Sequence, residues 1–280
     1  MHSRSRLALA TLATTSLLGL AADTASAYVF YKAQDSDAPL RWFRRNLEFR
    51  LSTTEPDDFP AADLLGLAEQ SFDAWINTAC GKVPDVVYMG TSDAQQGTAP
   101  GKLSDPPDNV IVFIHSQAKW VAAKADGGLG NSPTWIAITK IAHNTKTGEI
   151  VDADIEINDG GFKFSTDGTP GADEVDFQSM LTHEVGHYFG LDHSLDPTAT
   201  MFASYSRTAD GATQARTLAP DDEAGICELY TDVPLSSFES GDDGDSGNGC
   251  AGGGADGGLA ALGLLGVIGL GRRRAAGVNA

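Results

Sequence analysis

Apolar residues recur along the chain with two different periods, and these periods predict its secondary structure. Where apolar and polar residues alternate, or where β-branched and aromatic residues form short runs, we expect strands. The predicted strands are residues 47–51, 85–89, 109–115, 135–141 and 150–157. Where apolar residues recur every three to four positions, we expect amphipathic helices. The predicted helices are residues 60–79, 174–189 and 220–229. This order of elements predicts a single α+β domain.

Three of these segments carry further detail. Residues 109–115 are nearly all β-branched or aromatic, which predicts a central strand, and His115 at its end is interpreted as a structural residue and not as a ligand. Residues 159–173 form a loop rich in Gly, Asp, Ser, Thr and Pro. A calcium site in this loop stays open as a hypothesis, although the spacing of its carboxylates matches no recognised cation loop. The last helix begins with Pro220 and two aspartates, which suit a first helical turn.

Residues 183–193 carry the strongest chemical signal in the chain, the pattern H-E-x-x-H-x-x-G-x-x-H. On a helix, His183 and His187 lie on one face and can offer imidazole nitrogens to one metal ion. Gly190 can adopt the left-handed conformation that ends a helix, and the turned chain then brings His193 to the same ion. Three neutral imidazoles leave one coordination position open, which is typical of a catalytic zinc site.

Glu184 follows the first histidine of this motif and is predicted to be the catalytic base. Its carboxylate can take a proton from a zinc-activated water molecule and can later donate that proton, which is the chemistry of peptide-bond hydrolysis. This interpretation has two alternatives. The histidines could share an amphipathic helix by chance, although three of the six histidines of the chain lie in this window. The site could also bind zinc without cleaving peptides.

The N-terminal residues 1–27 have the pattern of a signal peptide. Two arginines precede an apolar run over residues 7–20, and Ala25-Ser26-Ala27 has the small-x-small form of a signal-peptidase site. We therefore expect the mature protein to begin near Tyr28. The apolar run is too short for a lasting membrane span. The protein is accordingly expected outside the cell or on its surface.

The C-terminal residues have the pattern of a sorting or anchor tail. A Gly/Asp/Ser-rich linker over residues 233–258 contains Cys250, and residues 259–274 combine an apolar segment with an arginine cluster. This arrangement resembles the MYXO-CTERM tails, which implies that Cys250 is a processing or lipid-attachment point. The arginines favour the cytoplasmic side, so membrane contact is expected only through this tail. Residues 275–280 are predicted to be a disordered end, and the alternative is that the whole tail is disordered.

Composition limits the partners of the chain. Its 19 basic and 38 acidic residues give a formal net charge of −19, which argues against binding to nucleic acid. The acidity suits either calcium binding or simple solubility, and composition does not separate the two. Residues 28–232 are long enough for one domain with its own core, and we expect that domain to be a monomer.

The three cysteines are interpreted from the expected compartment. An exported protein meets oxidising conditions, in which cysteines pair. If Cys250 belongs to the tail, Cys80 and Cys227 remain as a natural pair, and we predict a disulfide between them. The alternative is that both are free buried thiols.

Met201 stands eight residues after the last histidine of the motif. The two features together resemble the metzincin metalloproteases, in which a methionine turn lies beneath the metal. Residues 182–194 and 218–230 further resemble the matrixins, the group that includes the matrix metalloproteinases. The resemblance covers most of the domain. It implies a matrixin-like α+β catalytic domain with a five-stranded mixed sheet, three main helices and one catalytic zinc ion.

The resemblance also implies where a substrate lies. Residues 135–139, with Ile136, Ala137 and Ile138, correspond to an edge strand on which an extended peptide lies antiparallel. Phe202 and Tyr205 belong to the wall of the pocket next to the cleaved bond. By the same resemblance, Asp221 and Asp222 brace the methionine turn and the mature N-terminus.

These observations predict a secreted or surface-anchored zinc endopeptidase that acts on polypeptides. In this interpretation His183, His187 and His193 bind zinc, and Glu184 is base and acid. Two alternatives stay open. One is a surface binding module in which zinc only stabilises the fold. The other is a narrow enzyme that matures other surface proteins and ignores generic substrates.

Overall fold

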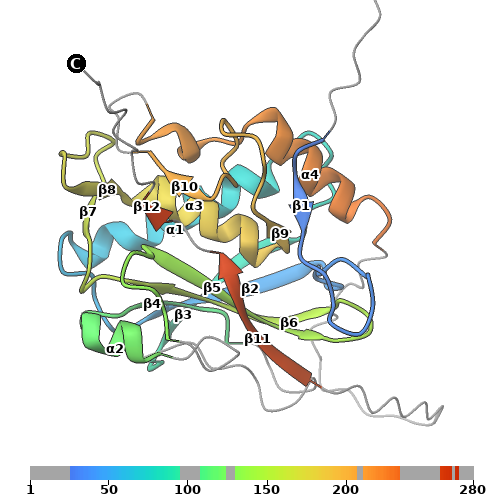
Figure 1. Cartoon of the computed structure of the whole chain (residues 1–280), viewed down its shortest axis with the longest axis horizontal. Helices are drawn as coiled ribbons and strands as arrows, with labels where there is room; N and C mark the ends of the chain where they lie inside the picture. The colour runs from blue at the N-terminus through green and yellow to red at the C-terminus, as the bar shows by residue number, and fades with distance from the viewer. Residues whose placement is uncertain are drawn as a thin grey trace, which may run out of the picture.

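A mixed sheet of six strands forms one layer of the molecule in the computed structural model, which describes residues 26–94, 108–123, 130–206, 211–233, 259–266 and 269–270 (Figure 1). The strands are β2 (Asn46–Ser52), β3 (Asp85–Ser92), β4 (Val110–Phe113), β5 (Ala137–Asn144), β6 (Ile150–Ile157) and β11 (Leu259–Gly266). Their order is β11-β5-β6-β4-β2-β3. Strands β3, β2, β4 and β6 run parallel to one another, and β5 runs antiparallel to β6. All five predicted strands are present and the mixed character is confirmed, with β4 buried and central as expected.

The sixth strand, β11, comes from the segment that the sequence indicated as part of a tail. It pairs antiparallel with β5 from Thr139 to Asn144. The prediction that the residue 135–139 strand has a free outer edge is therefore wrong at Thr139, and the strand itself begins at Ala137. The physical reason is that an outer strand presents unpaired N–H and C=O groups, which pair with any extended segment in reach.

Most of the predicted terminal features lie outside the described residues. These are the main part of the signal peptide, the linker with Cys250, the arginine cluster and the last six residues. Within the part of the chain that the structure describes, no helix has both the length and the apolar character needed to cross a membrane.

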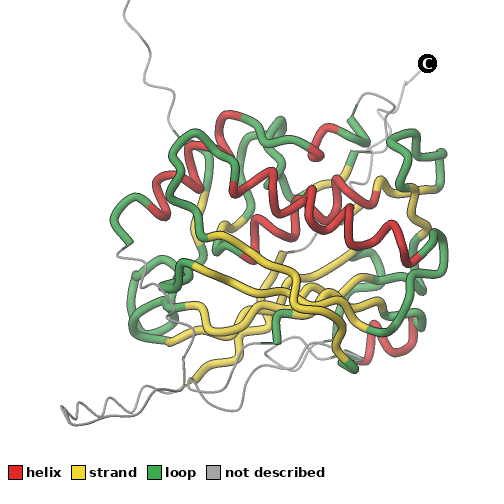
Figure 2. The backbone as a smooth tube through the Cα atoms, turned by 180° about the vertical axis from the view of Figure 1, so that it is seen from behind, coloured by secondary structure: helices red, strands yellow, loops and turns green. Residues whose placement is uncertain are grey.

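Three helices lie on the same side of the sheet, as Figure 2 shows from behind, and α1 and α3 contact its strands. They are α1 (Ala61–Ile76), α3 (Phe177–Tyr188) and α4 (Pro220–Tyr230), and they correspond to the three predicted helices. The apolar stripe of α1 is buried against α3 and the sheet, through residues that include Leu64, Leu67, Ala68, Phe72 and Trp75. The Trp75 indole N–H donates a 2.8 Å hydrogen bond to the Thr182 carbonyl, so α1 fixes the position of α3. Every residue of α3 is buried, and the helix runs through the middle of the domain.

The start of α3 differs from its prediction. Residues 174–176 were expected to be helical, but they form strand β8 (Glu174–Asp176), which pairs with β7 (Lys163–Ser165) inside the predicted loop 159–173. The helix begins afterwards because the Asp176 carboxylate accepts the N–H of Ser179 and acts as an N-cap. The spacing of apolar residues does not distinguish a capping aspartate from a residue inside the helix. The helix was therefore predicted to begin too early.

The opposite face of the sheet carries a second, smaller apolar cluster. It is built by a short helix that the sequence did not predict, α2 (Gln117–Ala122), whose Trp120 is fully buried. Trp120 packs among Val110 and Val112 of β4, Ile114 just after β4, and Ile138 of β5. Both faces of the central strands are therefore covered, which agrees with their continuous apolar character.

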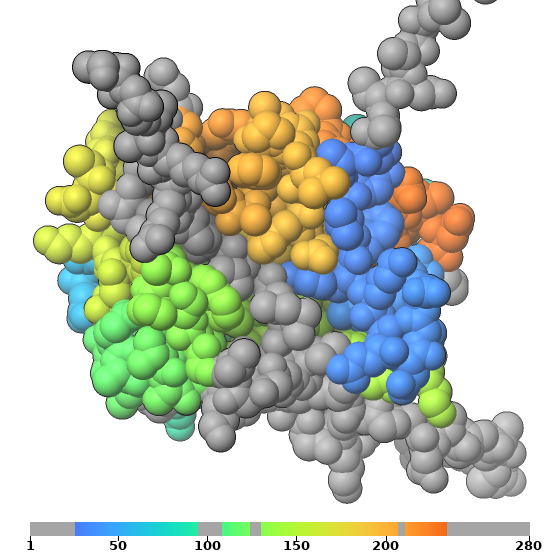
Figure 3. Space-filling view, viewed as in Figure 1, coloured from blue at the N-terminus to red at the C-terminus, as the bar shows by residue number. Residues whose placement is uncertain are grey.

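Short elements complete the fold and hold the ends of the longer ones. They are β1 (Val29–Phe30), β9 (Leu191–Asp192), β10 (Ser204–Tyr205), β12 (Gly269–Leu270) and a 3₁₀ helix at Gln214–Arg216. Strand β1 pairs antiparallel with β9, and β12 pairs parallel with β10. Figure 3 shows the N-terminal segment, in blue, packed beside the orange segment that follows α3. The segment after α3 is therefore fixed by the N-terminal residues.

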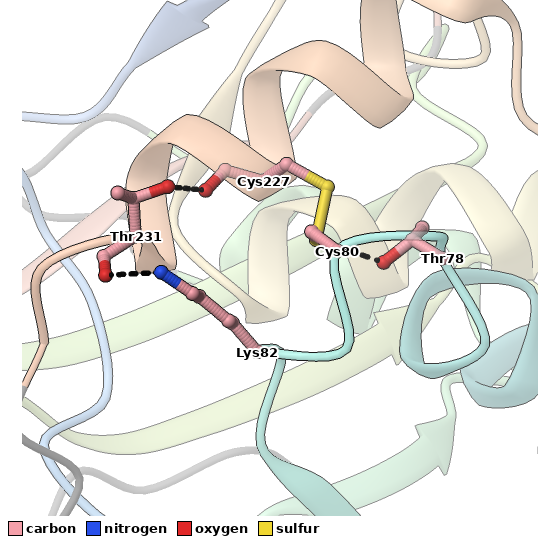
Figure 4. Close-up of a disulfide and its surroundings, with 5 residues drawn as sticks. All are labelled: Thr78, Cys80, Lys82, Cys227 and Thr231. Carbon is pink, nitrogen blue, oxygen red and sulfur yellow. Dashed lines mark hydrogen bonds between the residues drawn. A yellow bond between two sulfur atoms is a disulfide. The ribbon is translucent and has the colours of Figure 1, made fainter.

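A disulfide joins Cys80, in the turn after α1, to Cys227 in α4 (Figure 4). The Lys82 ammonium donates a hydrogen bond to the Thr231 carbonyl beside it, which adds a second link between the same two segments. The bridge closes a loop with a sequence separation of 147 residues. It therefore constrains most of the domain.

Candidate metal and catalytic site

Helix α3 places His183 and His187 side by side. The spacing of four residues puts both imidazoles on one face, with ring centroids 4.7 Å apart and their Nε2 atoms 3.0 Å apart. The helix ends at Tyr188, and Gly190 turns the chain with a φ of +105°. A Cβ at this position would collide with the carbonyl oxygen of Leu40, so both the conformation and the space require glycine. The predicted role of Gly190 as the helix stop is confirmed.

His193 is returned to the two helical histidines by the turned chain. Its ring centroid lies 5.3 Å from that of His183 and 4.9 Å from that of His187. One nitrogen from each of the three rings falls within a group whose members are all within 4.8 Å of one another. The pairing of β9 with β1 holds the segment that immediately precedes His193. The structure thus brings together the three predicted metal ligands.

The hydrogen bonds of the two helical histidines define which nitrogens are free to bind a metal. His183 Nδ1 lies 2.6 Å from the Thr200 carbonyl, and His187 Nδ1 lies 2.7 Å from the Leu191 carbonyl. A carbonyl oxygen only accepts, so both Nδ1 atoms carry the hydrogen in these contacts. In a neutral ring the Nε2 atom then presents a lone pair.

Burial keeps both rings neutral. It lowers the pKa of His183 to about 3, with the neighbouring His193 adding to the effect, and it lowers the pKa of His187 well below the usual value for histidine. Two Nε2 lone pairs therefore face each other across 3.0 Å, an arrangement that repels unless a cation lies between them. Neutral imidazoles held by carbonyl groups are the ligands that zinc prefers, so the residues fit this metal.

Glu184 lies on α3 beside the histidines and is fully buried. The Thr139 hydroxyl donates a 2.7 Å hydrogen bond to its Oε2 atom, while Oε1 has no hydrogen-bond partner among the described residues. Burial raises the pKa of the Glu184 carboxyl to about 8, and the Thr139 hydrogen bond opposes this rise. A carboxyl with one held oxygen and one free oxygen, and with its pKa near neutrality, is suited to exchange protons. The sequence did not indicate Thr139 as the partner of Glu184, because the two residues lie 45 positions apart and no local spacing relates them.

Met201 is buried directly against α3. A Cβ at Gly186 would collide with its sulfur atom, so the helix can approach the methionine only because residue 186 is glycine. The Asp222 carboxylate accepts the backbone N–H groups of Thr200 and Met201 at 2.7 and 3.0 Å. These bonds fix the turn whose Thr200 carbonyl holds His183. They agree with the bracing role that the resemblance implied for Asp222.

Asp221 binds the segment around the expected mature N-terminus, which the resemblance also named. Its carboxylate accepts the N–H of Ala27 at 2.9 Å and that of Tyr28 at 3.2 Å, and it also accepts the Ser194 hydroxyl. It therefore connects the residues around the expected mature N-terminus to the residue that follows His193. The sequence missed Tyr31, whose hydroxyl lies 3.2 Å from His187 Nδ1.

The residues expected to contact substrate fall into two groups. Phe202 and Tyr205 line a small pocket next to His183, as the expected position beside the metal requires. Ile136, Ala137 and Ile138 are fully buried, so their side chains face the interior and only their backbone could meet a peptide. The Tyr205 hydroxyl accepts the N–H of Asp176, which anchors the pocket wall to the start of α3.

Comparison with known proteins agrees with this geometry. The family model described as Matrixin matches residues 106–231. "Metalloendoproteinase 1-MMP" of Arabidopsis thaliana is 26% identical over 209 residues, which cover 71% of this chain and 47% of that protein. "Interstitial collagenase" of Bos taurus is 26% identical over 189 residues, which cover 68% of this chain and 32% of that protein.

A shorter but more similar stretch occurs in "Matrilysin" of Homo sapiens, which is 41% identical over 56 residues, or 20% of each chain. The chain spans less than half the length of these relatives. The similarities are at low identity over most of the domain. They show that the chain is similar to matrixin-type metalloproteases, and they agree with the α+β fold and with a histidine triad that could hold a metal ion.

Proposed function

We propose that this chain is an exported, zinc-dependent endopeptidase of the matrixin type. The observation that carries the proposal is the pair of helical histidines, whose Nε2 lone pairs face each other across 3.0 Å beside a buried glutamate. The metal would be held by His183, His187 and His193. Backbone carbonyl groups hold the Nδ1 atoms of His183 and His187, and the pairing of β9 with β1 holds the segment before His193. The two facing lone pairs repel each other, so the arrangement would cost free energy if it had only a structural role. It is explained if the site binds a catalytic ion.

The catalytic chemistry then follows from the position of each side chain. A bound zinc ion supplies Lewis acidity, which polarises a peptide carbonyl and makes a water molecule easier to deprotonate. Glu184 would accept the proton of that water at Oε1 and later deliver it to the departing amine nitrogen. Thr139 holds Oε2 in place, so the free oxygen keeps its orientation during the transfer. The burial of Glu184 excludes competing solvent from its carboxylate.

Strand β5 is proposed as the binding site for the substrate backbone. It already accepts an antiparallel strand from the chain itself, because β11 pairs with residues Thr139 to Asn144. The same strand carries Thr139, which contacts the catalytic glutamate. Because β11 occupies β5 from Thr139 onward, a peptide would lie antiparallel on the residues before Thr139, close to Glu184, with recognition through main-chain hydrogen bonds. The pocket lined by Phe202 and Tyr205 would receive one side chain next to the cleaved bond.

Export is proposed from two independent features. The N-terminal residues 1–27 have the order of a signal peptide. The structure contains a Cys80–Cys227 disulfide, which persists in an oxidising compartment outside the cytosol. Attachment to the surface through the tail with Cys250, and calcium binding by the loop after β6, stay predictions.

The direct test is digestion of a randomised peptide library by the purified full-length protein, with products identified by mass spectrometry. We expect cleavage that disappears after treatment with a chelator and returns when zinc is added back. Retained cleavage in metal-free protein contradicts a zinc mechanism. Binding of zinc with no cleavage of the library or of surface proteins from the native cell supports a zinc-stabilised binding module instead.

A further inference from the structure

The C-terminal strands β11 and β12, together called the tail segment, pair with two opposite walls of the candidate catalytic site. Strand β11 runs antiparallel to β5 and ends with Gly266 opposite Thr139. Strand β12 runs parallel to β10 and begins with Gly269 opposite Ser204. Figure 1 shows both strands in red, β11 beside β5 and β12 beside β10. Only residues 267 and 268 separate the two strands in the sequence, so one continuous segment connects the two walls.

Both walls belong to the candidate site itself. On the first wall, the Thr139 hydroxyl donates a hydrogen bond to Glu184, and β11 also contacts α3, the helix that carries Glu184. On the second wall, Ser204 and Tyr205 line the pocket next to His183. A strand that only covered the outer edge of β5 would need no contact with β10. The pairing with both strands therefore indicates that the tail segment lies across the site.

The tail segment uses the same backbone groups that a substrate would use. Because antiparallel strands run in opposite directions, a long peptide on β5 would place its N-terminal part on Thr139 and later residues. Strand β11 already pairs with that part of β5. A substrate side chain that enters the pocket lined by Phe202 and Tyr205 must approach the wall where β12 pairs with β10. A peptide and the tail segment therefore exclude each other.

The sequence of the tail segment suits a bound strand. Residues 259–270 contain no charged residue and include several glycines. Recognition by strand addition depends on main-chain hydrogen bonds, and glycine lets two backbones approach closely. An uncharged segment also brings no charge to the buried carboxyl of Glu184. Composition therefore allows the segment to bind at the site.

An irregularity in the pairing separates the tail segment from a good substrate. The register of β11 against β5 shifts between Leu262 and Gly266, next to the position opposite Thr139. Such a bulge bends the strand and disrupts the regular ladder. Cleavage requires a peptide bond held in a precise orientation toward the reacting groups. The irregular backbone at this point favours a bound segment that resists cleavage.

We propose that the tail segment fills the substrate groove of its own domain and keeps the protein latent until the segment is withdrawn or removed. The inference rests on the proposed endopeptidase function and adds its regulation. The segment belongs to the same chain as the groove, and a linked ligand has an effective concentration on the order of 1 mM. Even a weak main-chain interaction then competes with a free peptide that is more dilute.

The test weakens the pairing of β11 in the full-length protein. The variant is Ala260→Pro combined with Ala261→Pro. The N–H groups of successive strand residues point to opposite sides, so one of these two faces β5, and proline removes it. The matched control is Ala275→Pro combined with Ala276→Pro, which makes the same two replacements outside the tail segment.

The first measurement is the steady-state cleavage of a library-derived peptide. We expect kcat/KM to rise about tenfold in the β11 variant, because a linked competitor at millimolar effective concentration is weakened. The change should appear in KM with kcat unchanged, since a competitor for the groove leaves the chemical step unaltered. The control variant should behave as the wild type.

The second measurement does not depend on activity. Amide hydrogen exchange, followed by mass spectrometry, reports whether the backbone of residues Thr139 to Asn144 and of Ser204 to Tyr205 is paired. We expect slow exchange in the wild type and in the control, and faster exchange at both places in the β11 variant. Circular dichroism checks that each variant keeps its fold.

The outcomes separate this proposal from the proposed function. Equal exchange in the wild type and the β11 variant means that the tail segment does not occupy the groove, and the proposal is wrong. Faster exchange with unchanged kcat/KM means that the segment binds without blocking substrate, which also overturns latency. If no protein cleaves peptides, the proposed function fails and latency fails with it, while exchange still decides whether the segment lies on β5 and β10.

The intact mass of the protein excludes one further possibility. If the wild type releases its own tail during incubation and Glu184→Gln does not, the tail segment is a substrate of the site, and the proposal of a stable internal inhibitor is wrong. We expect the mass of both proteins to stay constant.

Discussion

The Thr139 hydroxyl donates its one hydrogen to Glu184 Oε2 at 2.7 Å, and the Glu184 carbonyl oxygen lies 3.1 Å from the same hydroxyl. The contact joins β5, the strand proposed to bind substrate, to the helix that carries two of the proposed metal ligands. It leaves Glu184 Oε1 as the oxygen available for proton transfer. One threonine thus couples the proposed substrate strand to the proposed catalytic base.

Thr139→Val should lower kcat with little change in KM, because it removes the hydroxyl and keeps the side-chain shape. Loss of one hydrogen bond to a charged group is worth about 1.5 kcal/mol, or roughly a tenfold decrease in rate. Thr139→Ser retains the hydroxyl and should restore most of the activity. Steady-state kinetics on a library-derived peptide, with zinc content measured in parallel, provides the check. Equal kcat values for the valine and serine variants would rule out this positioning role.

Gly186→Ala should destabilise the protein although alanine favours helices. A Cβ there would lie 2.6 Å from the Trp75 ring and would collide with Met201, and overpacking of a core costs about 1–3 kcal/mol. The gain in helix propensity is only about 1 kcal/mol, so overpacking should prevail. Gly66→Ala in α1 is the matched control, because the nearest atom to its Cβ is 4.0 Å away. Denaturant unfolding should show a loss for the first variant and a small gain for the second.

Removing the disulfide should lower the free energy of unfolding by about 2–5 kcal/mol. The proposed change is Cys80→Ser combined with Cys227→Ser, which releases a loop that spans most of the domain. Guanidinium unfolding with and without a reducing agent measures the effect. The wild type should lose stability when reduced, and the double variant should not respond. A double variant as stable as the oxidised wild type would show that the bridge contributes nothing to the fold.

Asp152 should make stability depend on pH in an unusual direction. Burial, the largest cause, raises the pKa of its carboxyl to about 6, while hydrogen bonds from the Asp108 and Asn109 backbone oppose the rise. The unfolded chain has an aspartate pKa of about 3.9, so the folded protein binds the proton more tightly. Its contribution is therefore fully present below about pH 4 and is lost as the pH rises through about 6.

Asp152→Asn removes this dependence and keeps a similar shape. The difference in unfolding free energy between variant and wild type should shift in favour of the variant by on the order of 2–3 kcal/mol from pH 4 to pH 7.5. Urea unfolding at a series of pH values measures it. A difference that stays constant over this range would mean that Asp152 is already ionised in the folded protein at acidic pH.

The features of this molecule that could be predicted from its sequence depend on the spacing of residues close together in the chain. The five strands, the three main helices and the helix stop at Gly190 each depend on residues that are close in the chain, so their periods and turn residues were sufficient. The positions of His183 and His187 follow from one turn of helix. These features needed no tertiary information.

What was missed depends on contacts between distant segments. The two-residue strands β1 and β9 exist only because they pair with each other, and β8 replaced a predicted helical turn because it pairs with β7. The Thr139–Glu184 bond joins residues that no local period relates. Strand β11 pairs with the outer strand β5, which lies far from it in the sequence.

The proposed role of Glu184 is to move the proton in a zinc-dependent cleavage of peptide bonds. The most direct measurement compares the wild type with Glu184→Gln, which keeps the shape and the Thr139 contact but cannot take up a proton as a carboxylate does. Zinc content and cleavage of the same library peptide are measured on each protein. We expect full zinc occupancy at the triad with cleavage reduced by about a thousandfold, whereas near-normal cleavage by the zinc-loaded variant would rule out the proposed role of Glu184.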